Sequence, residues 1–192
     1  MKLRPGNRRA WNGKTGIATV EMAMVLPLMI IMVFAIIDFG RLIQARIIVT
    51  NIAREGGSLA SRDALPVPNL VAMLQAGGTP LNMIAGGRIY IWRISAGTSA
   101  RSPDPWIDPT LSASAGGLNV PSSISSGQAN LGLTSQLYRH LEFDPDNQSS
   151  DISNVTVVEV FYKYSAITPI SKFVSGVMTD GGGEIVSSKA VF

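Results

Sequence analysis

The sequence predicts an α+β fold: a long N-terminal transmembrane helix that continues out of the membrane, then a small domain with an antiparallel sheet packed on helices. Residues 17–37 contain only Thr19 and Glu21 as polar side chains. Residues 38–61 contain no proline and repeat apolar residues at three- and four-residue steps, which is a helical period. Later segments are rich in β-branched and aromatic residues, as strands are.

The apolar run is long enough to cross a bilayer. It covers residues 17–37, and a helix needs about 20 residues to span a hydrocarbon core of ~30 Å. A soluble helix of this length normally shows polar positions along one face. We therefore expect a single span, continued by an amphipathic helix to residue 62. In that extension Gly56-Gly57 is the expected weak point, because glycine costs about 1 kcal/mol relative to alanine in a helix.

Positive charge is concentrated before the span. The first sixteen residues carry a charge of +5 and no acid, from Lys2, Arg4, Arg8, Arg9 and Lys14. Fewer basic residues follow the span directly, so the N-terminus is expected in the cytoplasm and the rest outside the inner membrane. Residues 1–16 are expected to be a disordered leader. Residues 63–192 have a charge of −3, so no nucleic-acid partner is expected.

The sequence predicts that the outer domain, residues 63–192, consists of short helices and strands. We expect a helix at 68–76, a strand at 88–94, a short helix capped by Thr134, a strand at 154–164 and a last strand at 184–192. In the strand at 154–164, the row containing Val158, Val160 and Tyr162 is more uniformly apolar and is expected inward. Residues 97–135 include 18 Gly, Ser or Pro among 39. They are expected to be a flexible loop or insertion, because they offer little apolar surface to offset ordering entropy.

The residues at the start of the span suggest proteolytic processing. Gly16 ends the basic leader, and Glu21 is the fifth residue after it. This arrangement resembles precursors of the prepilin class, which a membrane aspartic peptidase cuts on the cytoplasmic side, here between Gly16 and Ile17. An ionised carboxylate in a spanning helix costs about 2.5–3.5 kcal/mol and normally has a partner. Cleavage would create an ammonium group at Ile17 that could pair with Glu21. The alternative is an interfacial glutamate held near headgroups.

A longer stretch resembles the TadE-like family of the tight-adherence (Flp-type, type IVb) pilus system. The resemblance rests on Gly16, Val20-Glu21-x-Ala23, Leu26-Pro27, Asp38-x-Gly40-Arg41 and Asn51 to Gly57. Residues 155–169 resemble a later element of that family, and residues 63–153 show no resemblance. Ile17 stands where type IVa pilins usually have phenylalanine.

The resemblance implies a minor pilin or pseudopilin, anchored in the inner membrane or incorporated in the pilus. Its partners would be the prepilin peptidase, other major and minor pilins, the inner-membrane assembly platform and membrane lipid. Pro27 is expected to bend the helix, because proline removes one backbone hydrogen bond. The rival interpretation is an uncleaved, signal-anchored binding or scaffold protein.

No enzyme, metal or cofactor is expected. The chain has one histidine, His140, and no cysteine, which excludes thiol catalysis and thiolate metal sites. The acidic stretch 144–151 lacks the glycine and the closing glutamate of an EF-hand, so a solvated turn is favoured over a calcium loop. The glycines at 181–183 lack the Lys-Ser or Lys-Thr pair of a phosphate-binding loop.

Overall fold

The computed structural model describes residues 13–168 and 183–192. The chain divides into two compact units. The first comprises Met1–Gly40 and Ile167–Gly181, and the second comprises Arg41–Ala166 and Gly182–Phe192. Of the glycines at 181–183, only Gly183 lies among the described residues.

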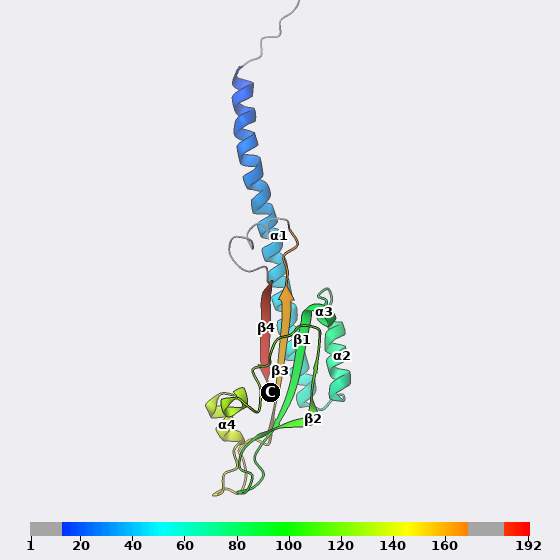
Figure 1. Ribbon diagram of the computed structural model, residues 1–192, viewed down its shortest axis with the longest axis vertical. Helices are drawn as coiled ribbons and strands as arrows, with labels where there is room; N and C mark the ends of the chain where they lie inside the picture. The colour runs from blue at the N-terminus through cyan, green and yellow to red at the C-terminus, as the bar shows by residue number, and fades with distance from the viewer. Residues whose placement is uncertain (1–12, 169–182) are drawn as a thin grey trace, which may run out of the picture. The chain divides into compact units, whose positions relative to one another are not determined.

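Helix α1 (Gly13–Ser61) is 49 residues long and continuous (Figure 1). It confirms the predicted long helix. The expectation of disorder is wrong for residues 13–16, which are helical. Helix propagation adds one backbone hydrogen bond for each residue fixed, so an apolar helix readily extends over a few preceding polar residues. Residues 1–12 lie outside the described part of the chain.

Four antiparallel strands form one sheet in the order β2-β1-β3-β4. They are β1 (Gly87–Ser95), β2 (Trp106–Ala115), β3 (Asn154–Tyr164) and β4 (Glu184–Val191). The strands predicted near 88–94, 154–164 and 184–192 are confirmed. With the long apolar helix and the short helices, this sheet confirms the α+β fold class.

Three helical segments cover one face of the sheet. They are residues 41–61 of α1, helix α2 (Val67–Gly77) and helix α3 (Met83–Gly86). Ile91 of β1 pairs in register with Val158 of β3, and both are buried in this core. The helices contribute apolar side chains that pack against those of the strands. The helix residues of this core are Val49, Ile52, Ala53, Ala60, Leu70, Val71, Leu74 and Met83. This core joins the helical extension of the span to the sheet.

The Gly56-Gly57 pair has a packing role that differs from the expected weak point. The helix runs through both residues, and both are buried. A Cβ at Gly56 would lie 2.6 Å from Leu74 Cδ1, and one at Gly57 would lie 2.3 Å from the ring of Phe192. The two glycines therefore let α1 approach its neighbours closely. The resulting burial offsets their helix-propensity cost of about 1 kcal/mol.

Arg93 of β1 contacts the C-terminal end of α1. Its guanidinium donates to Ala60 O at 2.8 Å and to Asn154 Oδ1 at 3.1 Å, and it pairs with the Asp63 carboxylate. A cation is favourable at a helix C-terminus, where the last carbonyls lack helical partners. The Arg93 side chain is only 9% exposed. Arg93 therefore fixes the end of α1 to the sheet through a buried charge-assisted hydrogen bond.

The opposite face of the sheet carries a second core. It contains Ile94, Val155 and Val157, packed with Ile124, Leu133 and Leu141. All of residues 155–160 are buried, so β3 is covered on both faces. The predicted inward row, with Val158 and Val160, does face a core. The other row is buried as well, because residues 118–133 cover that side of the strand.

The expectation of a loop throughout 97–135 is wrong for Trp106–Ala115, which form β2. This strand lies at the sheet edge and contains Pro109, next to a register irregularity opposite Ile91 and Arg93. Proline has no backbone N–H to donate to a neighbouring strand, so it occurs in sheets mainly at edge strands and bulges. Ser112 Oγ compensates by accepting from Arg93 N at 3.1 Å and donating to Asp108 O at 2.6 Å.

A short turn within β2 is stabilised by Asp108. Its carboxylate accepts hydrogen bonds from the Thr110 hydroxyl at 2.6 Å and the Thr110 amide at 2.8 Å. The hydroxyl bond first, and the amide bond second, lower the pKa of Asp108 below its ordinary value. Hydrogen bonds from a nearby side chain can take the place of the regular backbone hydrogen bonds between paired strands.

Residues 118–133 are fixed to the sheet by a buried carboxylate. Glu159 of β3 is 2% exposed and accepts hydrogen bonds from both hydroxyls and one amide of Ser122 and Ser123. Lys189 of β4, its partner in register, lies 3.6 Å from Glu159 Oε1. Buried carboxylates need such partners. The serines that lower the apolar content of this segment therefore supply the donors that hold it.

Aromatic side chains line the same face. Tyr90 stacks on Trp92 at 5.8 Å and meets Phe161 edge-on. The Tyr90 hydroxyl donates to Val120 O at 2.6 Å, and Trp92 Nε1 donates to Ser122 Oγ at 2.8 Å. These rings are half-buried and face the 118–133 segment with their polar ends satisfied.

Helix α4 (Ser135–Leu141) follows the 3-10 turn η1 (Ala129–Gly132). The predicted helix after Thr134 is confirmed, and Thr134 is its N-cap residue. Its side chain makes no capping hydrogen bond, so the predicted capping role is wrong in that respect. Leu141 is fully buried and ties this helix to the second core.

Candidate functional site

The predicted processing site lies in the first turns of α1. Gly16 and Ile17 are exposed, Ile17 by 64%, and a Cβ at Gly16 would meet nothing within 4 Å. The Gly16–Ile17 peptide bond is part of the helix. The surface around it is therefore open within the described chain, and a side chain added at Gly16 would leave the fold unstrained.

Glu21 lies four residues after Ile17 on the same helix and is exposed. Residues at this spacing share a helix face, and helical side chains lean towards the N-terminus. A carboxylate at Glu21 therefore lies within one turn of the Ile17 backbone nitrogen. Among residues 13–168 and 183–192, the carboxylate of Glu21 has no hydrogen bond or ion pair. The ion pairs of this part of the chain are Arg93–Asp63, His140–Asp151 and Lys189–Glu159.

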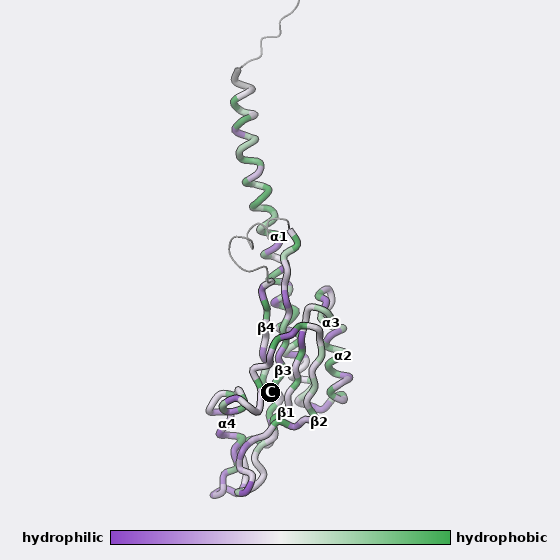
Figure 2. Tube along the Cα trace, in the orientation of Figure 1, coloured by the Kyte–Doolittle hydropathy of each residue, from purple (hydrophilic) through white to green (hydrophobic). Residues whose placement is uncertain are grey.

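Apart from Thr19 and Glu21, the helix from Ile17 to Val33 exposes apolar side chains. Residues 16–33 are all exposed, and α1 from Gly16 onward is long and apolar enough to cross a membrane. Figure 2 shows that hydrophobic residues predominate along this part of α1. Pro27 lies inside the continuous helix; a bend there stays a prediction. Apolar side chains exposed on every side are what a lipid environment requires.

A further contact in this unit was not anticipated from the sequence. Asp38, directly after the apolar run, accepts hydrogen bonds from Ile167 N at 3.2 Å, Thr168 N at 3.3 Å and the Thr168 hydroxyl. Thr168 is buried at 8% exposure. Asp38 and residues 167–168, each from a segment that carries the family resemblance, thus meet at a shared site. The sequence contained both segments, which was its signal for this contact. Only the folded chain brings the two segments together.

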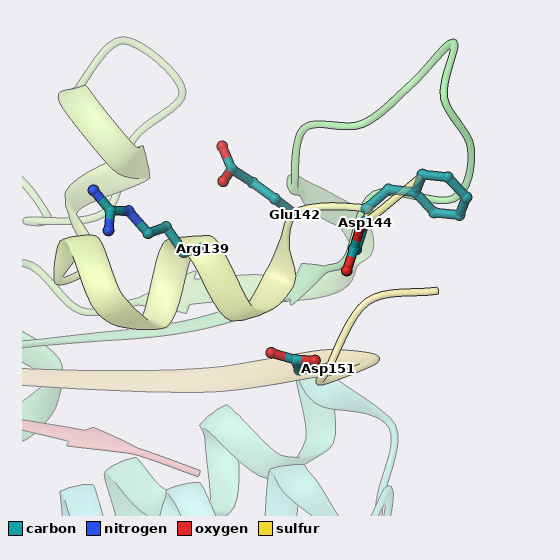
Figure 3. Close-up of a pocket in the computed structure, with 5 residues that line it drawn as sticks. Arg139, Glu142, Asp144 and Asp151 are labelled. Atoms are coloured by element: carbon teal, nitrogen blue, oxygen red, sulfur yellow. The ribbon is translucent and has the colours of Figure 1, made fainter. Parts of the chain in front are cut away.

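A shallow pocket of about 250 Å³ lies at the end of α4 (Figure 3). It is lined by Arg139, Glu142, Phe143, Asp144 and Asp151. Two of its acids already have partners. Asp151 contacts His140, and Asp144 accepts from Asp146 N and Asn147 Nδ2, which makes the solvated turn that the sequence favoured. In Figure 3 the labelled side chains do not converge on a common point.

His140 is exposed, and its Nδ1 lies at hydrogen-bond distance from Asp151, 2.7 Å from Oδ2. Among the residues described, no group of three or more His, Cys, Asp or Glu side chains is placed to hold a metal ion.

These features define a class: a protein with one long N-terminal helix, apolar over its first half and able to span a membrane, joined to an α+β domain. Comparison with known families gives the particular assignment. A family model described as TadE-like protein matches residues 16–58, so this helical region is TadE-like, as the sequence predicted. No curated protein and no solved structure gives a significant match to the chain.

The match points to a protein associated with the tight-adherence pilus, and the family it identifies is not one of enzymes. It begins at Gly16 and includes Ile17, Glu21, Pro27 and Asp38. The domain after residue 58 is outside the match and is described by the structure alone.

Proposed function

We propose that this chain is a minor pilin or pseudopilin of a tight-adherence, type IVb pilus, processed between Gly16 and Ile17. The observation that carries the proposal is the start of the TadE-like match at residue 16, where the basic leader ends. Gly16 and Ile17 are exposed on α1, which supports access by a membrane peptidase.

Processing changes the charge at the start of the helix. Removal of residues 1–16 takes away five basic side chains, so the formal side-chain charge falls from +3 to −2. It also creates an ammonium group at Ile17. A carboxylate within a spanning helix costs about 2.5–3.5 kcal/mol, and a cation nearby offsets part of that cost. Glu21, which has no partner among the described residues, pairs with this amine in the same subunit or a neighbouring one.

The remaining helix then acts in assembly. Its exposed apolar surface packs against lipid while the subunit waits in the inner membrane, with the leader cytoplasmic and the α+β domain in the periplasm. The same surface packs against other pilins in the pilus, or at its tip, with a bend at Pro27 adjusting the fit. The assembly platform and the prepilin peptidase are the membrane partners of this route.

The first experiment is intact-mass measurement and N-terminal sequencing of the protein extracted from membranes that contain the matching peptidase. The mature chain should begin at Ile17. Gly16→Val should accumulate the precursor, which keeps its first 16 residues. Gly40→Val is the matched control, because a Cβ at Gly40 also meets nothing within 4 Å but lies outside the cleavage motif. A chain that starts at Met1 in these membranes would contradict processing.

The second experiment separates cleavage from assembly. Glu21→Gln removes the charge and should be processed normally but lost from sheared pili or from the assembly complex. Met22→Gln is the control, since Met22 is 63% exposed and adds the same amide one residue away. If the Glu21 variant assembled as well as the control, charge pairing would be excluded as the role of Glu21.

An uncleaved, signal-anchored binding or scaffold protein is the alternative. It is supported by the packing of the α+β domain, whose two cores involve no residue before Val49 among their buried members. In that case both Gly16→Val and the unaltered chain would retain residues 1–16.

A further inference from the structure

The segment after β3 makes a specific contact with the end of the apolar part of α1. Asp38 Oδ1 accepts from Ile167 N at 3.2 Å and Thr168 N at 3.3 Å, and Oδ2 accepts from the Thr168 hydroxyl. Residues 167–168 are neither helix nor strand. One carboxylate therefore holds two consecutive backbone amides and a hydroxyl of an irregular segment.

The contact lies at the boundary of the apolar run. Asp38 is the first residue after 17–37, and Phe39 next to it is 64% exposed. The side chain of Ile167 is 63% exposed. The hydrogen bonds to Asp38 thus hold an exposed apolar side chain beside the end of the apolar part of α1.

The contact removes part of the cost of placing an irregular segment at the edge of a bilayer. An irregular backbone exposes N–H groups, and each unpaired group costs several kcal/mol when removed from water. Asp38 accepts from the N–H groups of both Ile167 and Thr168. These two groups therefore need no water, which leaves the exposed Ile167 side chain available for contact with lipid.

We propose that Ile167 is a second lipid contact of this protein, seated at the boundary of headgroups and acyl chains and positioned there by Asp38. The partner is the bilayer, and the side chain is buried in it to the same depth as Phe39. This inference depends on insertion of α1 in the membrane and is independent of processing or a pilin role.

The natural chain has no cysteine, so single cysteines can be introduced and spin-labelled without background. Ile167→Cys is compared with Ile30→Cys in the middle of the span, Phe39→Cys at its boundary and Glu55→Cys at an exposed polar position of α1. Each is reconstituted as the full chain in vesicles of phosphatidylcholine and phosphatidylglycerol. The ratio of collisions with oxygen to collisions with a water-soluble nickel complex reports depth in the bilayer.

Ile167→Cys should give a ratio within about two-fold of Phe39→Cys and several-fold above Glu55→Cys. Adding Asp38→Ala should lower the ratio at position 167 to that of Glu55→Cys. The ratios at positions 30 and 39 should stay unchanged, which shows that the helix is still inserted and folded.

Other results overturn the inference in distinguishable ways. A ratio at 167 equal to that of Glu55→Cys, with position 30 deep in lipid, excludes the lipid contact. Low collision rates with both reagents at 167 indicate that protein covers it instead, a neighbouring subunit included. An unchanged ratio after Asp38→Ala removes the positioning role of Asp38. Water access at position 30 means that α1 is not inserted, and the inference fails with that insertion.

Discussion

Replacement of Arg93 tests how α1 is fixed to the outer domain. Arg93→Met keeps an unbranched apolar stem of similar length but removes the donors to Ala60 O at 2.8 Å and Asn154 Oδ1 at 3.1 Å. A hydrogen bond from a charged group contributes about 1.5–3 kcal/mol, and the amide contact adds about 1 kcal/mol. The Asp63 pair adds under about 1 kcal/mol, because Asp63 is 66% exposed and screened by solvent.

The expected loss for Arg93→Met is therefore about 3 kcal/mol, and that for Asp63→Ala is under about 1 kcal/mol. For a chain of this size about 1 kcal/mol lowers Tm by roughly 2–4 °C, so Arg93→Met should lower it by about 6–12 °C. Near-ultraviolet circular dichroism of the full chain in detergent gives the transition, since Tyr90 and Trp92 are stacked in the domain. Equal losses for the two variants would refute the reasoning, because they would make the exposed ion pair the main contact.

Three further predictions concern the outer domain. Gly56→Val should lower the free energy of unfolding by about 1–3 kcal/mol through overpacking, and a gain in stability would contradict close packing at Gly56. Glu159→Ala should cost over about 2 kcal/mol and Lys189→Met under about 1 kcal/mol, since only the glutamate is fully buried; denaturant unfolding checks the order. Thr110→Val should raise the pKa of Asp108 towards its ordinary value in an NMR titration. Stability from the depressed pKa is present at neutral pH and is lost as pH falls through the folded-state value, so this variant should lose less stability in acid.

The long helix and the main strands could be predicted because their signals are local. A run of 21 residues with only two polar side chains, followed by a three-four apolar period, specifies a helix by itself. The β-branched and aromatic residues of 154–164 specify β3 in the same way. The TadE-like character of 16–58 is likewise a property of consecutive residues.

Strand β2 and the 118–133 segment could not be predicted from local composition. Serine, glycine and proline are typical of loops, and nothing in the order of these residues shows that Glu159, 36 residues after Ser123, will accept their hydrogen bonds. Ordering this segment depends on a buried carboxylate and on Tyr90 and Trp92, which other strands supply. Propensity is outweighed here by tertiary contacts.

The sequence by itself determined where a helix apolar and long enough to cross a membrane lies, where the basic N-terminal segment ends and where a glutamate interrupts the apolar run. These follow from hydropathy, charge and spacing along one helix, which require no knowledge of distant residues. Only the tertiary structure decided that Gly56-Gly57 packs against Leu74 and Phe192, and that Asp38 holds Thr168. Those contacts join residues up to 135 positions apart, and a hydrogen bond or a close packing contact exists only once the chain has brought both partners together.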